Sequence, residues 1–299
     1  MRPPSPSIPE KEFLYTSLKE SLRLDGRLSM EIRSPTLTFG DDLGWVECSL
    51  GKTRYVSHIK SSINAYSAYE RVLAHVEGKM VKPLPERPYE GIITIHSEIS
   101  PMASNEYEPG RPSDEEVTIT RMLDKVLKRS DAVDKESLCI LAGQRVWHIR
   151  LTLHFLADAG NMLDCACLAG MVALKHFRRP DVEVVGDEVT VHEPTERAPI
   201  PLAIHHTPFC FTFAFFPDPT IPPVIDPSQL EQRLSAGLIS IALNAQRELC
   251  VLQKLGGVPL DPDEVLKIVT IAVQKAKELN TVVDARLRED WEGRHVEVR

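Results

Sequence analysis

Short runs of alternating apolar and polar residues recur along the chain and are separated by turn residues. Runs at 37–39, 44–50 and 54–59 are interrupted by Gly40-Asp-Asp42 and Gly51-Lys-Thr53. Alternation with a period of two residues is typical of strands, and Gly or Asp between such runs marks hairpin turns. The pattern therefore predicts a meander of strands before residue 60. It predicts further strands at 91–97, 138–141, 146–157, 182–185, 188–192, 202–205, 209–216, 238–244 and 248–253.

Apolar residues spaced three and four apart predict helices between these strands. Ser113 and Glu116 form a capping box, and an apolar stripe follows them up to Leu127. A helix over 162–177 is apolar on most sides, so we expect it to be buried. Asp261-Pro262 begins a long last helix. We also expect helices at 10–22 and around 231–234.

The order of these elements predicts a duplicated α+β unit. Four strands, a helix, two strands and a helix occur twice, without repetition at the level of residues. Residues 61–90 break the rhythm, and we interpret them as an inserted loop with one short helix at 65–76. The predicted organisation is a tail and helix over 1–22, a first half over 23–160, a second half over 161–260, and a helix and tail over 261–299.

Composition narrows the class of protein. Of the 299 residues 42% are hydrophobic, a proportion typical of globular proteins, and no uninterrupted apolar run is long enough to cross a bilayer. The Pro- and Ser-rich start has no apolar segment of a secretory signal, so we expect an intracellular protein without membrane contact. The formal net charge of −8 makes any phosphate-binding surface local.

The usual catalytic and metal-binding motifs are absent. The six cysteines form no C-x-x-C pair, and the chain has no Gly-rich phosphate loop, H-E-x-x-H or G-x-S-x-G. Neighbouring His205 and His206 in a strand would point to opposite faces. Asp158 and Asp164 flank a helix start, where they could hold Mg²⁺, although capping the helix is the simpler role. We expect no metal and no cofactor.

The positively charged residues indicate a function more strongly than these motifs do. Arg23, Arg27, Lys52, Arg54, Arg71, Lys79, Lys82, Arg87 and Arg111 fall in expected loops, turns or strand ends of the first half. Such side chains either bind phosphates or are ordinary solvated surface. Arg111 follows Pro109-Gly110 directly before a helix N-terminus, where backbone amides also favour anions. An ion pair with one of the acidic residues at 114–116 is the alternative for Arg111.

Seven motifs in order resemble the RNase PH family, from about residue 20 to residue 257. They are Leu24-Asp-Gly-Arg27 with Glu31-Ile-Arg33, Leu50-Gly-Lys-Thr53, Pro101-Met-Ala103, Glu108-Pro-Gly-Arg111, Glu136-Ser-Leu-Cys139, Gly160-Asn-Met-Leu-Asp164 and Val224-Ile-Asp-Pro227. The runs 146–149, 176–190 and 201–206 are similar to those of the RNase PH-like ring subunits of the eukaryotic exosome. The resemblance implies the RNase PH fold, with two pseudo-symmetric β-α-β-α halves flanked by terminal helices.

The resemblance also implies the partners and the place of action. The implied partners are single-stranded RNA bound without regard to sequence, the other ring subunits, cap subunits with RNA-binding folds and a separate processive exonuclease. The implied locations are the nucleus, the nucleolus and the cytoplasm. Arg111, Arg71, Lys79 and Lys82 are the residues that we expect to contact RNA.

A departure from the active members concerns catalysis. Active RNase PH-type subunits carry an acidic residue just before the strand that is expected here near Leu238, but this chain reads Leu234-Ser-Ala-Gly-Leu238. The twin arginines of active relatives are reduced to Arg111. The sequence therefore favours a subunit without catalytic residues. An active phosphorolytic 3′-exoribonuclease is the alternative, and a nucleotide-dependent enzyme would need a phosphate loop that the chain lacks.

Overall fold

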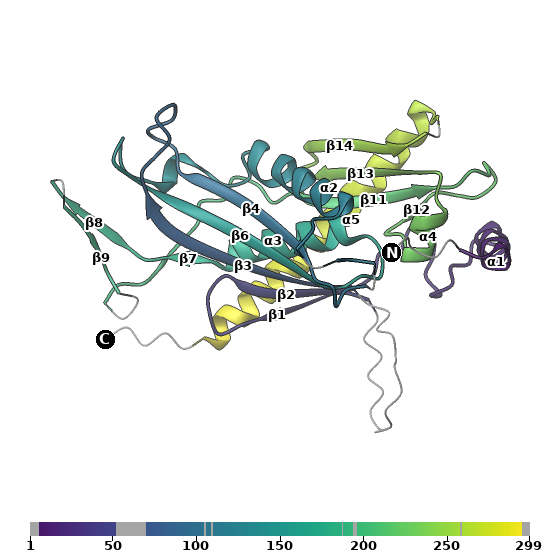
Figure 1. Ribbon diagram of the computed structural model, residues 1–299, viewed down its shortest axis with the longest axis horizontal. Coiled ribbons are helices and arrows are strands. Elements are labelled where there is room, and N and C mark those ends of the chain that lie inside the picture. Colours follow the sequence, from purple (N-terminus) through teal and green to yellow (C-terminus); the bar gives the residue numbers. More distant parts are fainter. Residues whose placement is uncertain are drawn as a thin grey trace, which may run out of the picture.

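Two β-sheets enclose a central helix in the computed structural model (Figure 1). The structure describes residues 6–51, 70–104, 106–108, 110–186, 188–193, 196–257 and 259–294. The larger sheet consists of β1 Pro35–Phe39, β2 Trp45–Leu50, β3 Glu70–Val81, β4 Ile92–Ile99, β5 Cys139–Leu141 and β6 Arg145–Ala157. The smaller sheet consists of β11 Phe209–Phe215, β12 Val224–Ile225, β13 Gly237–Leu243 and β14 Leu249–Gly256. Two-stranded pairs are formed by β7 Arg178–Arg179 with β10 Ile200–Pro201, and by β8 Val182–Val185 with β9 Glu188–Val191.

The helices are α1 Ile8–Lys19, α2 Asp114–Leu123, α3 Met162–His176, α4 Gln229–Leu234 and α5 Pro262–Gly293. A π-helical turn, Asp124–Arg129, continues α2, and a short 3₁₀ helix spans Glu136–Leu138. None of the helices in the described ranges is both long and apolar enough to cross a membrane. The sequence of strands and helices is the α+β arrangement that the hydrophobic pattern predicts.

The strand order of the larger sheet is β1-β2-β3-β6-β4, with β5 paired to β6. Neighbouring strands are antiparallel except β4 and β6, which are parallel. A parallel pair needs a crossover connection, and α2 lies on the chain between these two strands. The start of β3 and the ends of β4 and β6 therefore meet at one end of the sheet, with Arg71 opposite Ala157 and Ile99 opposite Phe155.

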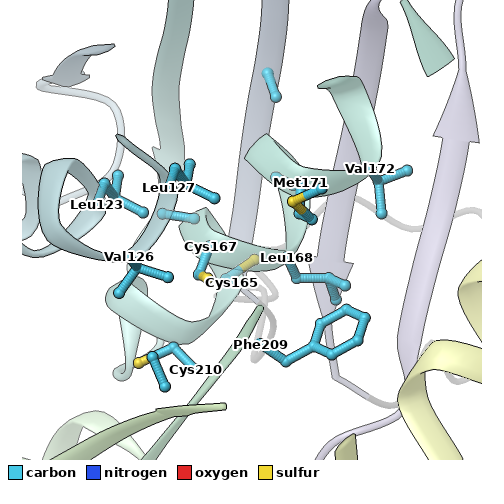
Figure 2. Close-up of a cluster of buried hydrophobic side chains, with 14 of the residues drawn as sticks. Leu123, Val126, Leu127, Cys165, Cys167, Leu168, Met171, Val172, Phe209 and Cys210 are labelled. Atoms are coloured by element: carbon cyan, nitrogen blue, oxygen red, sulfur yellow. The ribbon is translucent and has the colours of Figure 1, made fainter. Parts of the chain in front are cut away.

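The buried helix α3 joins the two sheets. It packs against β2, β3 and β6 on one side and against β11 on the other. Its Cys, Ala and Gly residues are small, so the sheets approach the helix closely. A Cβ atom on Gly170 would lie 3.0 Å from Leu151 Cδ2. Figure 2 shows Cys165, Cys167 and Leu168 of this helix in the core between Leu127 and Phe209. The expected burial of this helix is confirmed.

Two expectations about secondary structure are wrong. The inserted loop expected over 61–90, with a helix at 65–76, is instead a strand over Glu70–Val81. Val72, Ala74 and Val76 of that strand are buried and their neighbours are not, which is the alternation of a strand with one face on the core. The strand expected at 202–205 is reduced to one bridge between Ile204 and Val133. Residues 52–69, with the strand expected at 54–59 and with Lys52 and Arg54, lie outside the described ranges.

Candidate functional site

The structure places the four predicted RNA-contact residues at opposite ends of the larger sheet. Arg71 is the second residue of β3, at the end of the sheet where β4 leads toward the Gly110–Arg111 turn and α2. Lys79 pairs with His148 near the start of β6, and Lys82 follows the end of β3. Eight residues of strand separate Arg71 from Lys79, a distance of about 26 Å. Arg71 and Arg111 thus belong to one end, and the two lysines to the other.

Arg111 is exposed at the turn that precedes α2. Gly110 has φ +79°, a left-handed conformation that favours glycine, and a Cβ at this position would meet nothing within 4 Å. The Ser113 hydroxyl accepts from the Glu116 amide at 3.1 Å, but the reciprocal bond of the expected capping box does not form, because Glu116 Oε2 accepts from the Ile99 amide at 3.3 Å. The ion pair between Arg111 and the acidic first turn of α2, which was the alternative, does not form within the described ranges. The guanidinium therefore stays available to a ligand.

The other predicted contact residues differ in availability. Arg71 pairs with Glu47 of the neighbouring strand, with Nε 2.6 Å from Oε1. Lys79 lies 3.3 Å from Glu77 with its side chain largely exposed. Lys82 is exposed. Arg71 is thus partly neutralised, and the two lysines stand on solvated surface.

Two arginines that the sequence placed in phosphate-accessible loops are buried instead. Arg23 forms an ion pair with Glu231 at 2.5 Å, and both side chains are almost completely buried. Arg27 binds Asp226 through Nη1 at 2.8 Å. Their guanidinium groups also donate to backbone carbonyls of 225 and 226. With their donors used inside the protein, Arg23 and Arg27 cannot take RNA phosphates, so that hypothesis is wrong for both.

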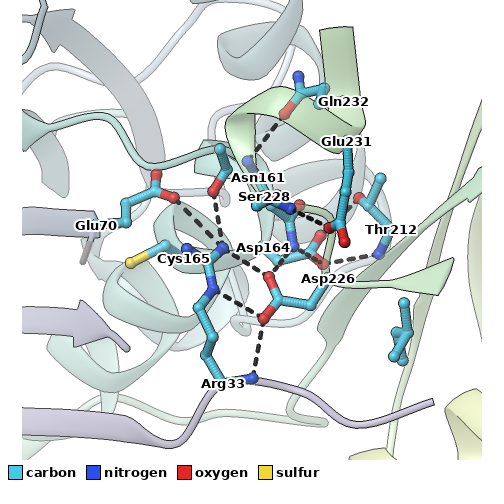
Figure 3. Close-up of polar contacts among 12 residues, drawn as sticks. Arg33, Glu70, Asn161, Asp164, Cys165, Thr212, Asp226, Ser228, Glu231 and Gln232 are labelled. Atoms are coloured by element: carbon cyan, nitrogen blue, oxygen red, sulfur yellow. Dashed lines mark hydrogen bonds and ion pairs between the residues drawn. The ribbon is translucent and has the colours of Figure 1, made fainter. Parts of the chain in front are cut away.

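Asp226 is the centre of a buried polar network that joins the two sheets (Figure 3). One carboxylate oxygen accepts from Arg33 Nη2 at 2.7 Å and from Asn161 Nδ2 at 2.7 Å. The other accepts from the backbone N and the Nε of Arg33, both at 2.9 Å. The network continues through Asp164, which accepts from the backbone N of Thr212 at 2.7 Å. It holds the start of α3 against both the segment before β1 and the smaller sheet.

The same burial has opposite effects on the acidic groups of this network. Burial alone would raise the pKa of Asp226, but Arg33 and Arg27 lower that pKa well below its usual range. Asp164 has no arginine partner among the described residues, and burial raises its pKa to about 6 although Asn161 and Thr212 donate to it. Glu70 is completely buried, and no described residue donates a hydrogen bond to its carboxylate. Burial raises its pKa well above the ordinary value although Arg33 Nη2 lies 3.9 Å away. Sequence reasoning missed this network because its members are far apart in the chain.

A cavity of about 290 Å³ lies where α2, the start of α3 and strands β13 and β14 meet. Leu238, Gln232 and Ser240 line it, so it adjoins the segment before β13 where active relatives are expected to carry an acidic residue. That segment reads Ser235-Ala236-Gly237 and offers no carboxylate. The charged residues of the lining are Asp114 and Glu115, and no Lys or Arg is among the described lining residues. We call this cavity the acidic pocket.

The carboxylates of Glu115 and Asp158 beside the acidic pocket form no ion pair with a Lys or Arg among the residues that the structure describes. Tyr107 donates its single hydroxyl proton between Glu115 Oε2 and Asp158 Oδ2, each 3.2 Å away. Burial and the neighbouring Asp158 raise the pKa of Glu115. Burial and the two carboxylates raise the pKa of Tyr107 as well. This arrangement disfavours another anion, and an incoming phosphate would meet like charge.

The Mg²⁺ site considered for Asp158 and Asp164 does not form. Asp164 faces the interior and accepts from Asn161 and Thr212, whereas Asp158 accepts from the Gly160 amide and from Tyr107. Within the described ranges no group of three or more His, Cys, Asp or Glu side chains could hold a metal ion. Asp158 therefore stabilises the turn before α3, whereas the side-chain cap that the sequence favoured does not form: Asn161 at the N-cap accepts from no amide of the first turn.

Comparison with known proteins places this geometry in a family. Residues 31–180 match domain 1 of the 3′ exoribonuclease family RNase PH, and residues 206–275 match domain 2. The exosome complex component rrp45 of Schizosaccharomyces pombe is 40% identical over 95% of this chain and 91% of its own length. The exosome complex component RRP45 of Homo sapiens is 42% identical over 95% of this chain. The chain spans only 61% of that human relative.

Solved structures support the same fold. A structure described as the Archaeoglobus fulgidus exosome with RNA bound to the active site matches with a TM-score of 0.73 and 23% identity, over 91% of this chain and 96% of that chain. An archaeal exosome core matches with a TM-score of 0.71 and 21% identity, over 92% of this chain and 96% of that chain. The resemblance read from the motifs is confirmed: the chain belongs to the RNase PH family of 3′ exoribonucleases, as a relative of the exosome complex components RRP45.

Proposed function

We propose that this chain is a non-catalytic, RNase PH-like subunit of an RNA exosome ring. Both family domains are present, and its relatives at 40% and 42% identity are named as exosome components. In this role the chain scaffolds the ring and lines the path of RNA, thereby supporting 3′-to-5′ processing and degradation by another subunit. Its partners are the other ring subunits, the cap subunits and a separate processive exonuclease, in the nucleus, the nucleolus and the cytoplasm.

The acidic pocket is the observation that carries the non-catalytic assignment. Phosphorolysis brings orthophosphate against a phosphodiester, so the site must stabilise added negative charge with cations or protons. The described lining contains no Lys or Arg but does contain Asp114 and Glu115. Ser235-Ala236-Gly237 supplies no carboxylate for acid–base or metal-assisted chemistry. The buried arginines of the polar network are already committed to Asp226 and Glu231.

The residues proposed to contact RNA are the cations at the end of the sheet beside α2. Arg111 has no ion pair in the described part of the chain and lies on the exposed turn before α2, so its guanidinium can bind a phosphate without reading a base. Arg71 lies at the same end of the sheet, although Glu47 competes for its guanidinium. Lys79 and Lys82 lie at the far end, where they would contact RNA only on a separate path.

The test is phosphorolysis by the assembled complex. The chain is reconstituted with its ring partners, and release of nucleoside diphosphates from single-stranded RNA is measured with and without orthophosphate. We expect no release that depends on this chain. The acidic-pocket variant Glu115→Gln is compared with Asp131→Asn, a change at an exposed carboxylate outside the pocket. Orthophosphate-dependent release that only Glu115→Gln abolishes would show an active exoribonuclease. Native mass measurement of the same sample tests membership of the ring.

A further inference from the structure

A second cavity, which we call the basic groove, lies along α2 and the π-helical turn. Its volume is about 520 Å³, and Ile95 of β4 with Gln253 and Leu255 of β14 form its other side. Arg121, Lys125 and Arg129 line it from the helical side. None of these three cations was singled out by the sequence motifs, since they read as the solvated face of an amphipathic helix.

The π-helical turn keeps the three cations on one side. Along a straight α-helix each residue four positions further is turned about 40° more around the axis, so Arg129 would rotate away from Arg121. Residues 124–129 form hydrogen bonds of the wider i→i+5 type, which takes more residues per turn and reduces that rotation. Lys125 and Arg129 both belong to this turn. The irregularity therefore aligns the row of cations with the groove, and such turns are frequent at functional sites.

Positive charge in the groove exceeds what the protein itself neutralises. Asp124 is the acidic residue of the described lining, and it is shared between Lys128 at 3.6 Å and Arg129 at 3.4 Å. Arg121 is exposed and has no ion pair with a described residue. Lys125 is held in place by a neutral partner, with Nζ 2.9 Å from Gln253 Oε1. A positioned lysine and an unpaired arginine are suited to an incoming anion.

From this geometry we infer that the basic groove binds the phosphodiester backbone of single-stranded RNA. Arg121 and Lys125 stand about 6 Å apart along the helix axis and Arg129 follows about one turn later, so a row of anions suits them better than a single ion does. Ile95 and Leu255 are the apolar side chains of the described lining, which leaves no deep apolar site for the anchoring residue of a protein partner. Binding is therefore electrostatic and independent of base sequence.

The inference deepens the proposed function, because it adds an RNA contact to the same chain. It is separate from the Arg111 turn: the groove adjoins the acidic pocket at Thr118 and Leu255, but its row of cations begins at Arg121, about 10 Å along the axis from the first residue of α2. The acidic residues at 114–116 occupy the helix between the two. Its test measures binding and not phosphorolysis, so the two proposals can fail independently.

The experiment measures binding of a fluorescent oligouridylate of about 12 nucleotides to the full chain and to the assembled complex. The groove variant combines Arg121→Ala, Lys125→Ala and Arg129→Ala. The matched control combines Lys267→Ala, Lys277→Ala and Arg288→Ala, which removes the same charge from exposed positions on α5. Affinity is followed as salt is varied. We expect the groove variant alone to lower the slope of log K against log salt by about 2, from three lost phosphate contacts.

Three results decide the matter. Equal loss of affinity in both triple variants would reduce the effect to net charge and overturn the inference. Unchanged RNA binding combined with loss of the variant from the complex would identify the groove as a protein interface, which also overturns it. Selective loss of RNA affinity, with an unfolding midpoint and native mass like those of the control, supports it. A single Lys125→Arg change, which keeps the charge, should retain most of the binding.

Discussion

Arg33 and Asp226 are 193 residues apart in the sequence and meet in the interior through three hydrogen bonds. The pair joins the segment before β1 to the turn after β12, and both side chains are almost fully buried. Asp226 has φ +50°, an uncommon conformation for a residue other than glycine. The conformation aims one carboxylate at Arg33, Arg27 and Asn161 together. One residue thus fixes the smaller sheet to the larger one.

Loss of this carboxylate should destabilise the fold severely. Asp226→Asn leaves the buried guanidinium groups of Arg33 and Arg27 without their counterion, and breaking a buried pair in this way costs about 3–5 kcal/mol. Urea unfolding followed by circular dichroism measures the loss. The control is Glu77→Gln, which breaks exposed pairs of β3 worth about 0–1 kcal/mol. Equal losses in the two variants would contradict a central role for Asp226.

Asp164 should make stability depend on pH in the direction opposite to a salt-bridged acid. Its pKa of about 6 in the folded chain exceeds the ordinary 3.8, so folding takes up a proton between these values. Its stabilising contribution is complete below about pH 4 and is lost as the pH rises through about 6, by at most about 1.4 kcal/mol per pH unit. Asp226, whose pKa is lowered, instead loses its contribution as the pH falls.

Comparing the wild type with Asp164→Asn isolates this effect. Burial lowers the pKa of His176 and thereby gives a slope of opposite sign, but that slope is common to both proteins and cancels in the difference. The unfolding free energy is measured in urea at intervals from pH 4 to pH 8. The advantage of the wild type over the variant should shrink as the pH rises and level off above about pH 7. A constant difference across this range would show that Asp164 does not titrate there.

Local sequence signals predicted the elements with their own start and stop residues. Ser113 caps α2, and α5 begins at Pro262 directly after Asp261 as expected although the Asp261 side chain forms no cap bond, because such start signals act within the first turn. The signal failed at β3, where Glu, Arg, Leu and Ala are good helix formers. The alternation of Val72, Ala74 and Val76 was present in the sequence, but the pairing with β2 and β6 that favours a strand is not local.

The buried network could not be predicted for a related reason. Arg23, Arg27 and Arg33 occur in polar surroundings that resemble surface loops, and their partners Asp226 and Glu231 lie about two hundred residues later. A single sequence contains no signal that pairs them. Arg111 was identifiable because its environment, a glycine turn before a capped helix, is local.

Gly160 marks a close approach between the turn before α3 and the start of α4. It has φ +91°, and a Cβ there would lie 2.3 Å from the Gln229 backbone N and 2.5 Å from the Ser228 carbonyl carbon. Gly160→Ala therefore adds a clash with backbone to the cost of a left-handed conformation, which is of order 1–3 kcal/mol alone. Gly143→Ala is the matched control, since φ is +75° and nothing lies within 4 Å. Chemical denaturation should show the larger loss of unfolding free energy for Gly160→Ala. Similar losses in the two variants would mean that the start of α4 moves to accommodate the added methyl group.

Loss of the exposed Arg111 should affect RNA binding, whereas loss of the buried Arg27 should affect stability. It has no described ion-pair partner to lose, so Arg111→Glu should leave the unfolding midpoint and the native mass of the complex unchanged. It should weaken single-stranded RNA binding regardless of sequence and reduce the salt slope by about one unit, because one phosphate contact is lost. Arg288→Glu on α5 controls for the change in charge. Arg27→Ala should do the reverse, since its guanidinium stabilises Asp226 in the interior: the unfolding midpoint falls while RNA affinity per folded molecule is retained. An Arg111 variant that binds RNA with the wild-type affinity and slope would make this residue ordinary surface and would leave the RNA path to the basic groove.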